Sequence, residues 1–291
     1  MKQVTVENII CGIVTYNPNI KRLEECLKAV KSQLNNVIVY DNGSKNSLEI
    51  SKLVKKIIPN GIFVKNAKNM GIAQGLAEIM NFAKIKKYLW VLALDQDSIL
   101  QKGLVKAYLK TINSGLYIDA GMLTCLIRDR NFNDPKYECQ ESSVLSVKYC
   151  ITSASLTNVT AYFKTSGYDR QFFIDCVDFD ICYSLSEKGY KIYRINYLGL
   201  LQEVGHGENR NFLFKQIVVY HEKPIRIYYL SRNLCLLYAK HSSYKCLTLM
   251  KKELALFLKI ILYEDAKKQK IFAFFKGLHD AAKLRNYKVD M

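Results

Sequence analysis

Two carboxylates follow the most strongly apolar segment of this sequence. Residues 88–95 read YLWVLALD, which predicts a strand buried on both faces, and Asp95 and Asp97 end it with Gln96 between them. Two acids held this close by a rigid strand can bind one hard divalent cation, Mg²⁺ or Mn²⁺, which also takes phosphate oxygens of a substrate. The stretch DQDS also suits a helix N-cap before residues 99–110. The spacing of the two acids leaves both interpretations open.

A second group of acids lies in the segment FFIDCVDFDIC, residues 172–182. Asp175, Asp178 and Asp180 stand at the start of a predicted helix that ends at Gly189, where the helix dipole favours ionised acids. A carboxylate within reach of a hydroxyl can take its proton while that oxygen forms a new bond. We expect Asp180 to be only a helix cap.

Strands alternate with helices in the first third of the chain. The hydrophobic spacing predicts strands at residues 9–16, 36–40, 61–65 and 88–95 and helices at residues 20–34 and 69–87. This order implies right-handed crossovers and a mostly parallel sheet. Ligands of such sheets bind beyond the carboxyl ends of the strands.

Polar residues gather at these carboxyl ends. They are Thr15, Tyr16 and Asn17 after the first strand, Asp41, Asn42 and Ser44 after the second, and Asp95 and Asp97 after the fourth. Each group taken singly could be ordinary turn chemistry. Together they predict one polar crevice at the edge of the sheet.

The remainder of the chain predicts a loop and then a helical end. Residues 131–147 are polar and lack periodicity, residues 190–195 read as a strand, and the chain beyond residue 229 reads as basic helices. We therefore expect a catalytic domain at residues 1–225 and a basic helical region at residues 226–291.

Composition narrows the class of protein. The 291 residues carry a net charge of +17, so a partner is expected among nucleic acids, anionic membranes and phosphorylated substrates. The nine cysteines form no CxxC pair, which indicates a reduced compartment and no structural zinc. No segment resembles a signal peptide or a membrane span, so a cytoplasmic protein is expected.

The ordered motifs GIVTYNP, VYDNGS, NMGIAQG, LALDQDS, TSASL, GYDRQFFIDCVDFDIC, SEKGYKIY and RIYYLSRN resemble family 2 glycosyltransferases, in particular the bacterial rhamnosyltransferase-like branch. The resemblance implies a GT-A fold, a Rossmann-like α/β fold with a mixed, mostly parallel sheet flanked by helices and a C-terminal helical extension. It implies inverting, metal-dependent transfer of a sugar, with rhamnose as the family-level guess. The donor would be dTDP- or UDP-linked and the acceptor a lipid-linked glycan of a capsule or O-antigen.

The resemblance also implies roles for individual residues. The catalytic base falls on Asp178 with Asp175 beside it, and the metal ligands fall on Asp95 and Asp97, with Mn²⁺ or Mg²⁺ as the ion. Nucleotide-binding positions fall on Thr15, Tyr16, Asn17, Asp41, Asn69, Gly71, Asp95 and Gln96.

The sequence departs from the family pattern at two places. Relatives often read HxxG where this chain reads QEVG from Gln202, with His206 just beyond, so Gln202, His206 or water completes the metal shell. The stretch TSASL, which contains Ser153, has no glycine where one is common in the acceptor pocket.

Two arginines in the stretch HEKPIRIYYLSRN could bind an anionic group. Arg226 and Arg232 are near enough on a helix to reach one diphosphate or acceptor group, since guanidinium forks suit phosphates. The alternative is a pair of surface arginines beside Tyr228 and Tyr229 in the core.

The basic end has the composition of interfacial helices. Leu254, Phe257, Leu258 and Ile261 share one side, near the lysines Lys251, Lys252, Lys267, Lys268 and Lys270. This favours peripheral association with the anionic inner face of the plasma membrane, although the apolar side could instead pack on the catalytic domain. The competing hypotheses are a nucleic-acid-binding protein, which lacks a recognised binding motif here, and a catalytically inactive transferase-like scaffold.

Overall fold

The structure, a computed structural model, describes residues 3–130, 144–202, 208–212, 215–241 and 246–287. The chain forms two compact units. The first contains Met1–Gln171 and Ile181–Glu203, and the second contains Phe172–Asp180 and Val204–Met291. The boundary expected after residue 225 therefore falls inside the second unit. None of the helices described is long and apolar enough to cross a membrane.

The first unit is built on one mixed sheet. Within the described residues its strand order is β3-β2-β1-β4-β8-β6-β9-β5, with β7 added on β9. The strands are β1 Ile9–Thr15, β2 Val37–Asp41, β3 Ile62–Lys65, β4 Trp90–Asp95, β5 Ile99–Leu100, β6 Ala120–Asp129, β7 Val144–Val147, β8 Leu156–Asn158 and β9 Lys191–Gln202. Strands β3, β2, β1 and β4 are parallel, as the alternation of strands and helices predicts, whereas β8 is antiparallel to β4 and β6.

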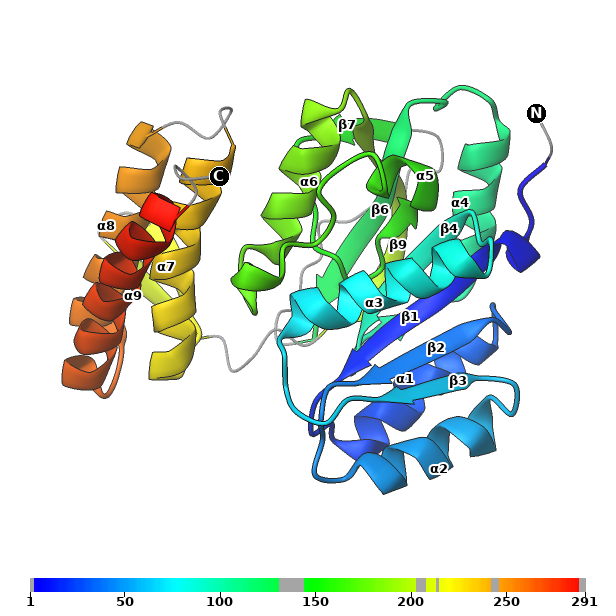
Figure 1. Cartoon of the computed structure of the whole chain (residues 1–291), viewed down its shortest axis with the longest axis horizontal. Helices are drawn as coiled ribbons and strands as arrows, with labels where there is room; N and C mark the ends of the chain where they lie inside the picture. Colours follow the sequence, from blue (N-terminus) through cyan, green and yellow to red (C-terminus); the bar gives the residue numbers. More distant parts are fainter. Residues whose placement is uncertain (1–2, 131–143, 203–207, 213–214, 242–245, 288–291) are drawn as a thin grey trace. The chain divides into compact units, whose positions relative to one another are not determined.

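Helices cover both faces of this sheet (Figure 1). They are α1 Ile20–Lys31, α2 Ser47–Ile57, α3 Ile72–Ile85, α4 Leu104–Asn113 and α5 Val159–Tyr162. Alternate residues of β1, namely Ile9, Cys11 and Ile13, lie in a fully buried core with side chains of α1, α2 and α4. The opposite face of β1 presents Gly12, where a Cβ would lie 2.4 Å from the Ile79 side chain of α3. Glycine at this position therefore lets α3 approach the sheet closely.

The prediction of a loop at residues 131–147 is partly wrong. Residues 131–143 lie outside the described residues, but Val144–Val147 forms β7 and pairs antiparallel with Ile192–Ile195 of β9. The segment VLSV carries no strong alternation of its own, and a partner almost fifty residues away provides its hydrogen bonds.

The second unit is a helical bundle with a hairpin, and it confirms the helical end of the chain. Its elements are the hairpin strands β10 Glu208–Phe212 and β11 Lys215–Val219 and the helices α7 Pro224–Lys240, α8 Cys246–Tyr263 and α9 Lys267–Tyr287. A proline at the first helical position suits α7, because its missing N–H has no partner there in any case. Ile227, Ile260, Ala273 and Phe274 form the apolar core between these helices.

The helical end differs from expectation in its details. Phe257, expected on the outer side of α8, packs inward, and its ring centroid lies 5.2 Å from that of Phe274. Lys270, expected at the surface, is 2% exposed. Helix α6 (Val177–Glu187) begins in the second unit's Phe172–Asp180 segment and continues in the first unit.

Candidate functional site

The carboxylate of Asp41 joins the ends of β1 and β2. Thr15 Oγ1 donates a hydrogen bond to Asp41 Oδ1 over 3.1 Å, and the Ser44 hydroxyl donates to the same oxygen. Asn17 N–H in turn donates to Ser44 Oγ over 2.8 Å, and Asn17 Oδ1 accepts from Lys45 N–H at 2.8 Å. Because Asp41 is fully buried, its visible role is to fix the two loops that follow these strands.

Asn42 connects the loop after β2, in which it lies, to the loop after β3. Its Nδ2 donates to Asn69 Oδ1 and to the Gly71 carbonyl, both at 2.9 Å, and its Oδ1 accepts from Met70 N–H at 3.0 Å. Asn69 Oδ1 also accepts from Gly71 N–H. The structure thus brings the predicted Asn69 and Gly71 to the carboxyl end of β2, next to Asp41.

The end of β4 lies beside the end of β1. Tyr16 N–H donates to Gln96 Oε1 over 2.8 Å, which links the two strand ends directly. Gln96 and Asp97, with Asn19 and Arg22 from the start of α1, line an open hollow of about 310 Å³. The predicted convergence of polar residues therefore holds for Tyr16 with Asp95 and Asp97, and Gln96 makes the connecting hydrogen bond.

Two buried side chains, Ser153 and Cys26, hold the backbone at the end of β4. Asp95 N–H donates to Ser153 Oγ over 3.2 Å, and Ser153 also hydrogen bonds Ser98. Cys26 Sγ donates to the Asp95 carbonyl at 3.6 Å, and burial, together with Asp97 and Asp95, raises the pKa of this thiol. Ser153 is 2% exposed, so its described contacts position Asp95, and a contact with acceptor or diphosphate stays a prediction.

The stretch TSASL has no glycine, yet one of its residues adopts a backbone conformation that glycine favours. Ala154 adopts φ 60°, in the left-handed region that glycine enters without cost. Its backbone is held by Ala93, whose carbonyl accepts from Ala154 N–H at 2.8 Å, and by Tyr108, whose hydroxyl donates to the Ala154 carbonyl at 2.7 Å. The neighbouring strand and helix therefore impose the conformation on alanine.

Gln202, at the end of β9, fits a cation site at Asp95. Its Nε2 donates to Asp95 Oδ2 over 3.1 Å. Its Oε1 is buried and, in the part of the chain that the structure describes, has no hydrogen-bond partner. Carboxylate and amide oxygens are the ligands that Mg²⁺ and Mn²⁺ accept, so this donor set fits such an ion. His206 lies outside the described residues.

The acids of the second unit have distinct environments. Asp175 pairs with Arg226, whose Nη2 and Nε donate to its two oxygens at 2.9 and 3.4 Å. Asp180 is 1% exposed and accepts from Lys240 at 2.9 Å and contacts His241 Nε2 at 2.8 Å. The expectation that Asp180 is a helix cap is wrong, since Asp180 lies inside α6 and its partners are the last residue of α7 and the residue that follows it. Asp178 lies half-buried in the first turn of α6.

The two predicted arginines do not converge on a common group. Arg226 also pairs with Glu222 at 2.9 Å. Arg232 is buried, donates to Asn233 Oδ1 at 3.0 and 2.8 Å, and lies over the Tyr229 ring at 4.7 Å. Their contact with a diphosphate stays a prediction.

Comparison with known proteins assigns the family. Residues 11–176 match the family described as Glycosyl transferase family 2. The chain belongs to this family. The match spans the ends of β1, β2 and β4 and reaches Asp175 and Cys176, whereas Gln202 lies beyond it.

Individual relatives agree with this family. The dTDP-rhamnosyl transferase RfbF of Shigella flexneri is 24% identical over 245 residues, which cover 80% of this chain and 81% of that protein. S. aureus TarS in complex with UDP-GlcNAc has a TM-score of 0.59 at 13% identity and covers 93% of this chain and 81% of its own. The mannosyltransferase PcManGT of Pyrobaculum calidifontis, in complex with GDP-Man and Mn²⁺, has a TM-score of 0.58 at 15% identity over 95% and 75% of the two chains. These likenesses establish the GT-A-like fold of this family 2 glycosyltransferase.

The sequence motifs missed three residues at these sites. Asn19 and Arg22 line the hollow beside Asp97, and their signal was the position of α1 directly after the first strand. Asn233 lies in the quoted stretch RIYYLSRN and hydrogen bonds the acidic segment. No local pattern marks that role.

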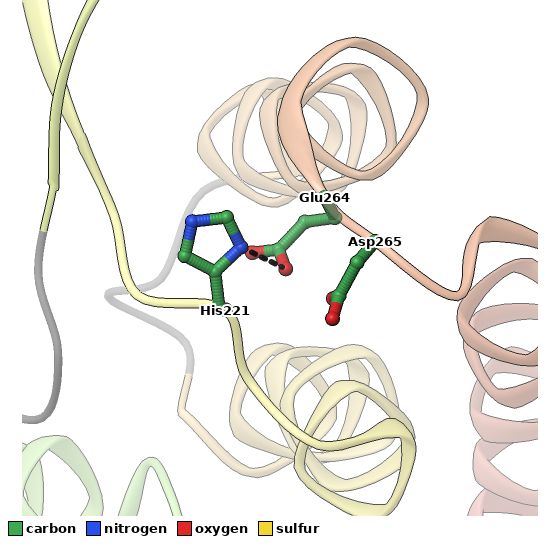
Figure 2. Close-up of side chains that lie close together, drawn as sticks. All are labelled: His221, Glu264 and Asp265. Carbon is green, nitrogen blue, oxygen red and sulfur yellow. Dashed lines mark ion pairs between the residues drawn. The ribbon is translucent and has the colours of Figure 1, made fainter.

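A third group of possible ligands lies in the second unit (Figure 2). His221, Glu264 and Asp265 offer ligand atoms within 4.8 Å of one another, and His221 Nδ1 lies 3.7 Å from Glu264 Oε2. The ammonium of Lys270 pairs with Glu264 Oε2 at 2.6 Å and also with Asp265 Oδ1. Since Lys270 already pairs with both carboxylates, the group is an ion-pair cluster with Glu264 and Lys270 buried and Asp265 exposed, and it does not require a metal.

Proposed function

We propose that this family 2 glycosyltransferase is an inverting enzyme that transfers a sugar, with rhamnose as the first candidate, from a dTDP- or UDP-linked donor to a hydroxyl of a lipid-linked glycan. The observation that carries the proposal is the end of β4. There Asp95 and Asp97 follow a buried strand beside Gln202, next to the loops fixed by Asp41 and Asn42.

The donor side is proposed to use the crevice of the first unit. Thr15, Tyr16, Asn17, Asn69 and Gly71 would hold the base and ribose, with the buried Asp41 keeping their loops in register. Asp95, Asp97 and Gln202 would hold Mn²⁺ or Mg²⁺, and the bound ion supplies positive charge to the departing diphosphate. The Arg22 guanidinium beside Asp97 is suitably placed in the hollow for an anionic donor.

The acceptor side is proposed to use Asp178 as general base. The acceptor oxygen forms its bond to the anomeric carbon as the bond to the diphosphate oxygen breaks, and its proton passes to the Asp178 carboxylate. Asp175 and Asp180 are bound by Arg226 and by Lys240 with His241. The choice of Asp178 among the three acids rests on its position in FFIDCVDFDIC, which matches the acidic motif of the family.

Calorimetry with UDP and dTDP tests the donor side. Binding in the presence of Mn²⁺ should be strong in the wild type and weak in Asp95→Asn, Asp97→Asn and after EDTA. Ser146→Ala, on β7, serves as a control that should bind normally. Equal affinity with Mn²⁺ and with EDTA would remove the metal from the proposal, and no binding of either nucleotide would contradict the donor assignment.

The donor sugar is the finer part of the proposal. The name of the Shigella flexneri relative supports rhamnose, whereas the TarS and PcManGT structures contain UDP-GlcNAc and GDP-Man. A thermal-shift panel of these nucleotide sugars and dTDP-rhamnose with Mn²⁺ separates the candidates, since a ligand that binds only the folded state raises the melting temperature. The largest rise should come from dTDP-rhamnose.

The acceptor side includes a proposed membrane contact. Six apolar residues of α8 lie three or four positions apart or adjacent and are each 37–62% exposed: Leu247, Met250, Leu254, Leu258, Ile261 and Leu262. Lys251 lies among them, and Lys267 and Lys268 begin α9. An apolar helical face flanked by lysines suits an anionic lipid surface. A second copy of the chain is a poorer partner, because it would bring these lysines together.

A further inference from the structure

The turn that precedes Asp178 has an unusual backbone. Phe173, Asp175 and Cys176 adopt φ values of 56°, 64° and 61°. Residues other than glycine and asparagine rarely adopt this left-handed conformation. Three of them in one short turn therefore persist only where their surroundings hold them. The turn leads directly into the first helical residue, Val177, and then Asp178.

One side chain of α7 makes the holding contacts. Asn233 is fully buried, and its Nδ2 donates to the carbonyls of Phe172 and Ile174 at 2.7 Å each and of Asp175 at 3.0 Å. Three carbonyls that converge on one amide nitrogen fix three of the peptide planes of the turn. All these residues belong to the second unit.

Arg232 fixes the orientation of this amide. Its Nε and Nη2 donate to Asn233 Oδ1, so the oxygen faces the guanidinium and the nitrogen must face the carbonyls. The guanidinium lies over the Tyr229 ring, and that ring stacks on Phe173 with centroids 4.9 Å apart and planes 11° apart. The stack therefore holds the same turn from its side-chain face.

We propose that Asn233, oriented by Arg232, is a positioning residue that holds residues 172–176 in this conformation and thereby places Asp178 for proton transfer. The inference rests on the proposed role of Asp178 as base. Asn233 acts only through the backbone of the turn, whereas Asp178 contacts the acceptor hydroxyl.

Asn233→Leu tests this proposal, because leucine keeps the size of the side chain and removes its donors. Transfer should fall ~10-fold or more in kcat, since small displacements of a catalytic group are costly, while nucleotide affinity stays at the wild-type value. Amide hydrogen exchange in residues 173–178 should become faster. Asn233→Ser provides a second variant in case leucine prevents folding.

Leu237→Ala is the matched control, because Leu237 is buried in the same helix and has no hydrogen-bonding side chain with which to hold the turn. It should lower the melting temperature without changing exchange in residues 173–178 or kcat. Unchanged exchange in Asn233→Leu would overturn the proposal, as would a kcat equal to that of the control. If Asp178→Asn retains full transfer while exchange in Asn233→Leu is faster, the base assignment has failed and the positioning role falls with it, although Asn233 would still hold the turn.

Discussion

Asp175, Asp178 and Asp180 lie close together in the sequence, yet their side chains have different partners. Arg226 binds Asp175, and Lys240 and His241 enclose Asp180. These partners lie about fifty to sixty residues further along the chain, so the residue types alone could not separate the three acids. The resemblance to the family placed the base on Asp178, and this assignment stays a prediction.

Replacing each acid by asparagine should separate chemistry from stability. Asp178→Asn keeps the size of the side chain but cannot accept the hydroxyl proton, so sugar transfer should fall ~10²- to 10⁴-fold while nucleotide affinity and folding survive. Asp180→Asn leaves Lys240 with a neutral partner in a buried site, which should cost about 3 kcal/mol of unfolding free energy. Transfer assays and urea denaturation measure the two effects. An active Asp178→Asn variant would contradict its assignment as base.

Glu253 should make the stability of the fold depend on pH. Burial raises the pKa of this carboxyl to about 8, although a hydrogen bond from Cys235 opposes the rise. Its Oε2 is buried and has no hydrogen-bond partner among the described residues. The folded state keeps a proton that the unfolded state loses from about pH 4.5 upward, so stability should fall between pH 4.5 and pH 8 and then level off.

Glu253→Gln should remove this dependence. The variant should melt at a higher temperature than the wild type at pH 8 and close to it at pH 5, because glutamine carries no charge into the buried site. Thermal melting across this pH range measures the difference. Parallel curves for the two proteins at all pH values would show that Glu253 is ionised at neutral pH in the folded state.

At the scale of elements, the sequence predicts what local hydrophobic patterns determine better than it predicts pairings between distant segments. The strands β1 to β4 and the polar residues at their ends follow from hydrophobic spacing and from the rule for parallel sheets. The strand β7 did not follow, because its hydrogen bonds depend on β9. Likewise the division of the chain into units depends on the Phe172–Asp180 segment joining α7, which no composition change along the chain marks.

The ion pairs that join α9 to the α8–α9 connection should be essential to the second unit. Lys270 is 2% exposed; burial alone lowers its pKa, but hydrogen bonds to Asp265 and Glu264 raise it above its ordinary value. Lys270→Met would leave Glu264 as a buried charge without its partner. The free energy of unfolding should therefore fall by about 3–5 kcal/mol.

A double variant provides the control for Lys270→Met. Adding Glu264→Gln removes the unpaired charge, and most of the lost stability should return. Urea denaturation of both variants gives the comparison. If the double variant is as unstable as Lys270→Met, packing of the lysine stem rather than its charge explains the loss.

At the scale of the whole molecule, the net charge of +17 comes from basic residues in different environments. The segment 246–287 carries nine lysines and arginines against four acids. Some of these cations are engaged inside the unit: Lys270 binds Glu264, and Lys252 lies 4.7 Å from the Phe179 ring. Lys251 in α8 and Lys267 and Lys268 at the start of α9 are exposed, so they are the candidate cations for the proposed membrane contact.

This face should bind vesicles in proportion to their anionic lipid. Phosphatidylcholine vesicles that contain phosphatidylglycerol should retain the protein in flotation, and those without it should retain much less. Added salt should weaken binding, because charges beyond about 8 Å are screened at physiological ionic strength. Replacing Lys251, Lys267 and Lys268 by glutamine should lower the partition coefficient by roughly two orders of magnitude, at about 1 kcal/mol for each lysine.

Apolar substitutions separate insertion from charge attraction alone. Leu247, Leu254 and Leu258 changed to serine should weaken binding at every salt concentration, since each inserted leucine contributes up to about 1.5–3 kcal/mol. Ile85, Leu116 and Ile118 are even more exposed residues of the first unit, and their change to serine should leave binding intact. If the two triple variants float alike, or if lipid charge has no effect, then α8 is not the membrane-binding surface, and its apolar face must be covered by protein.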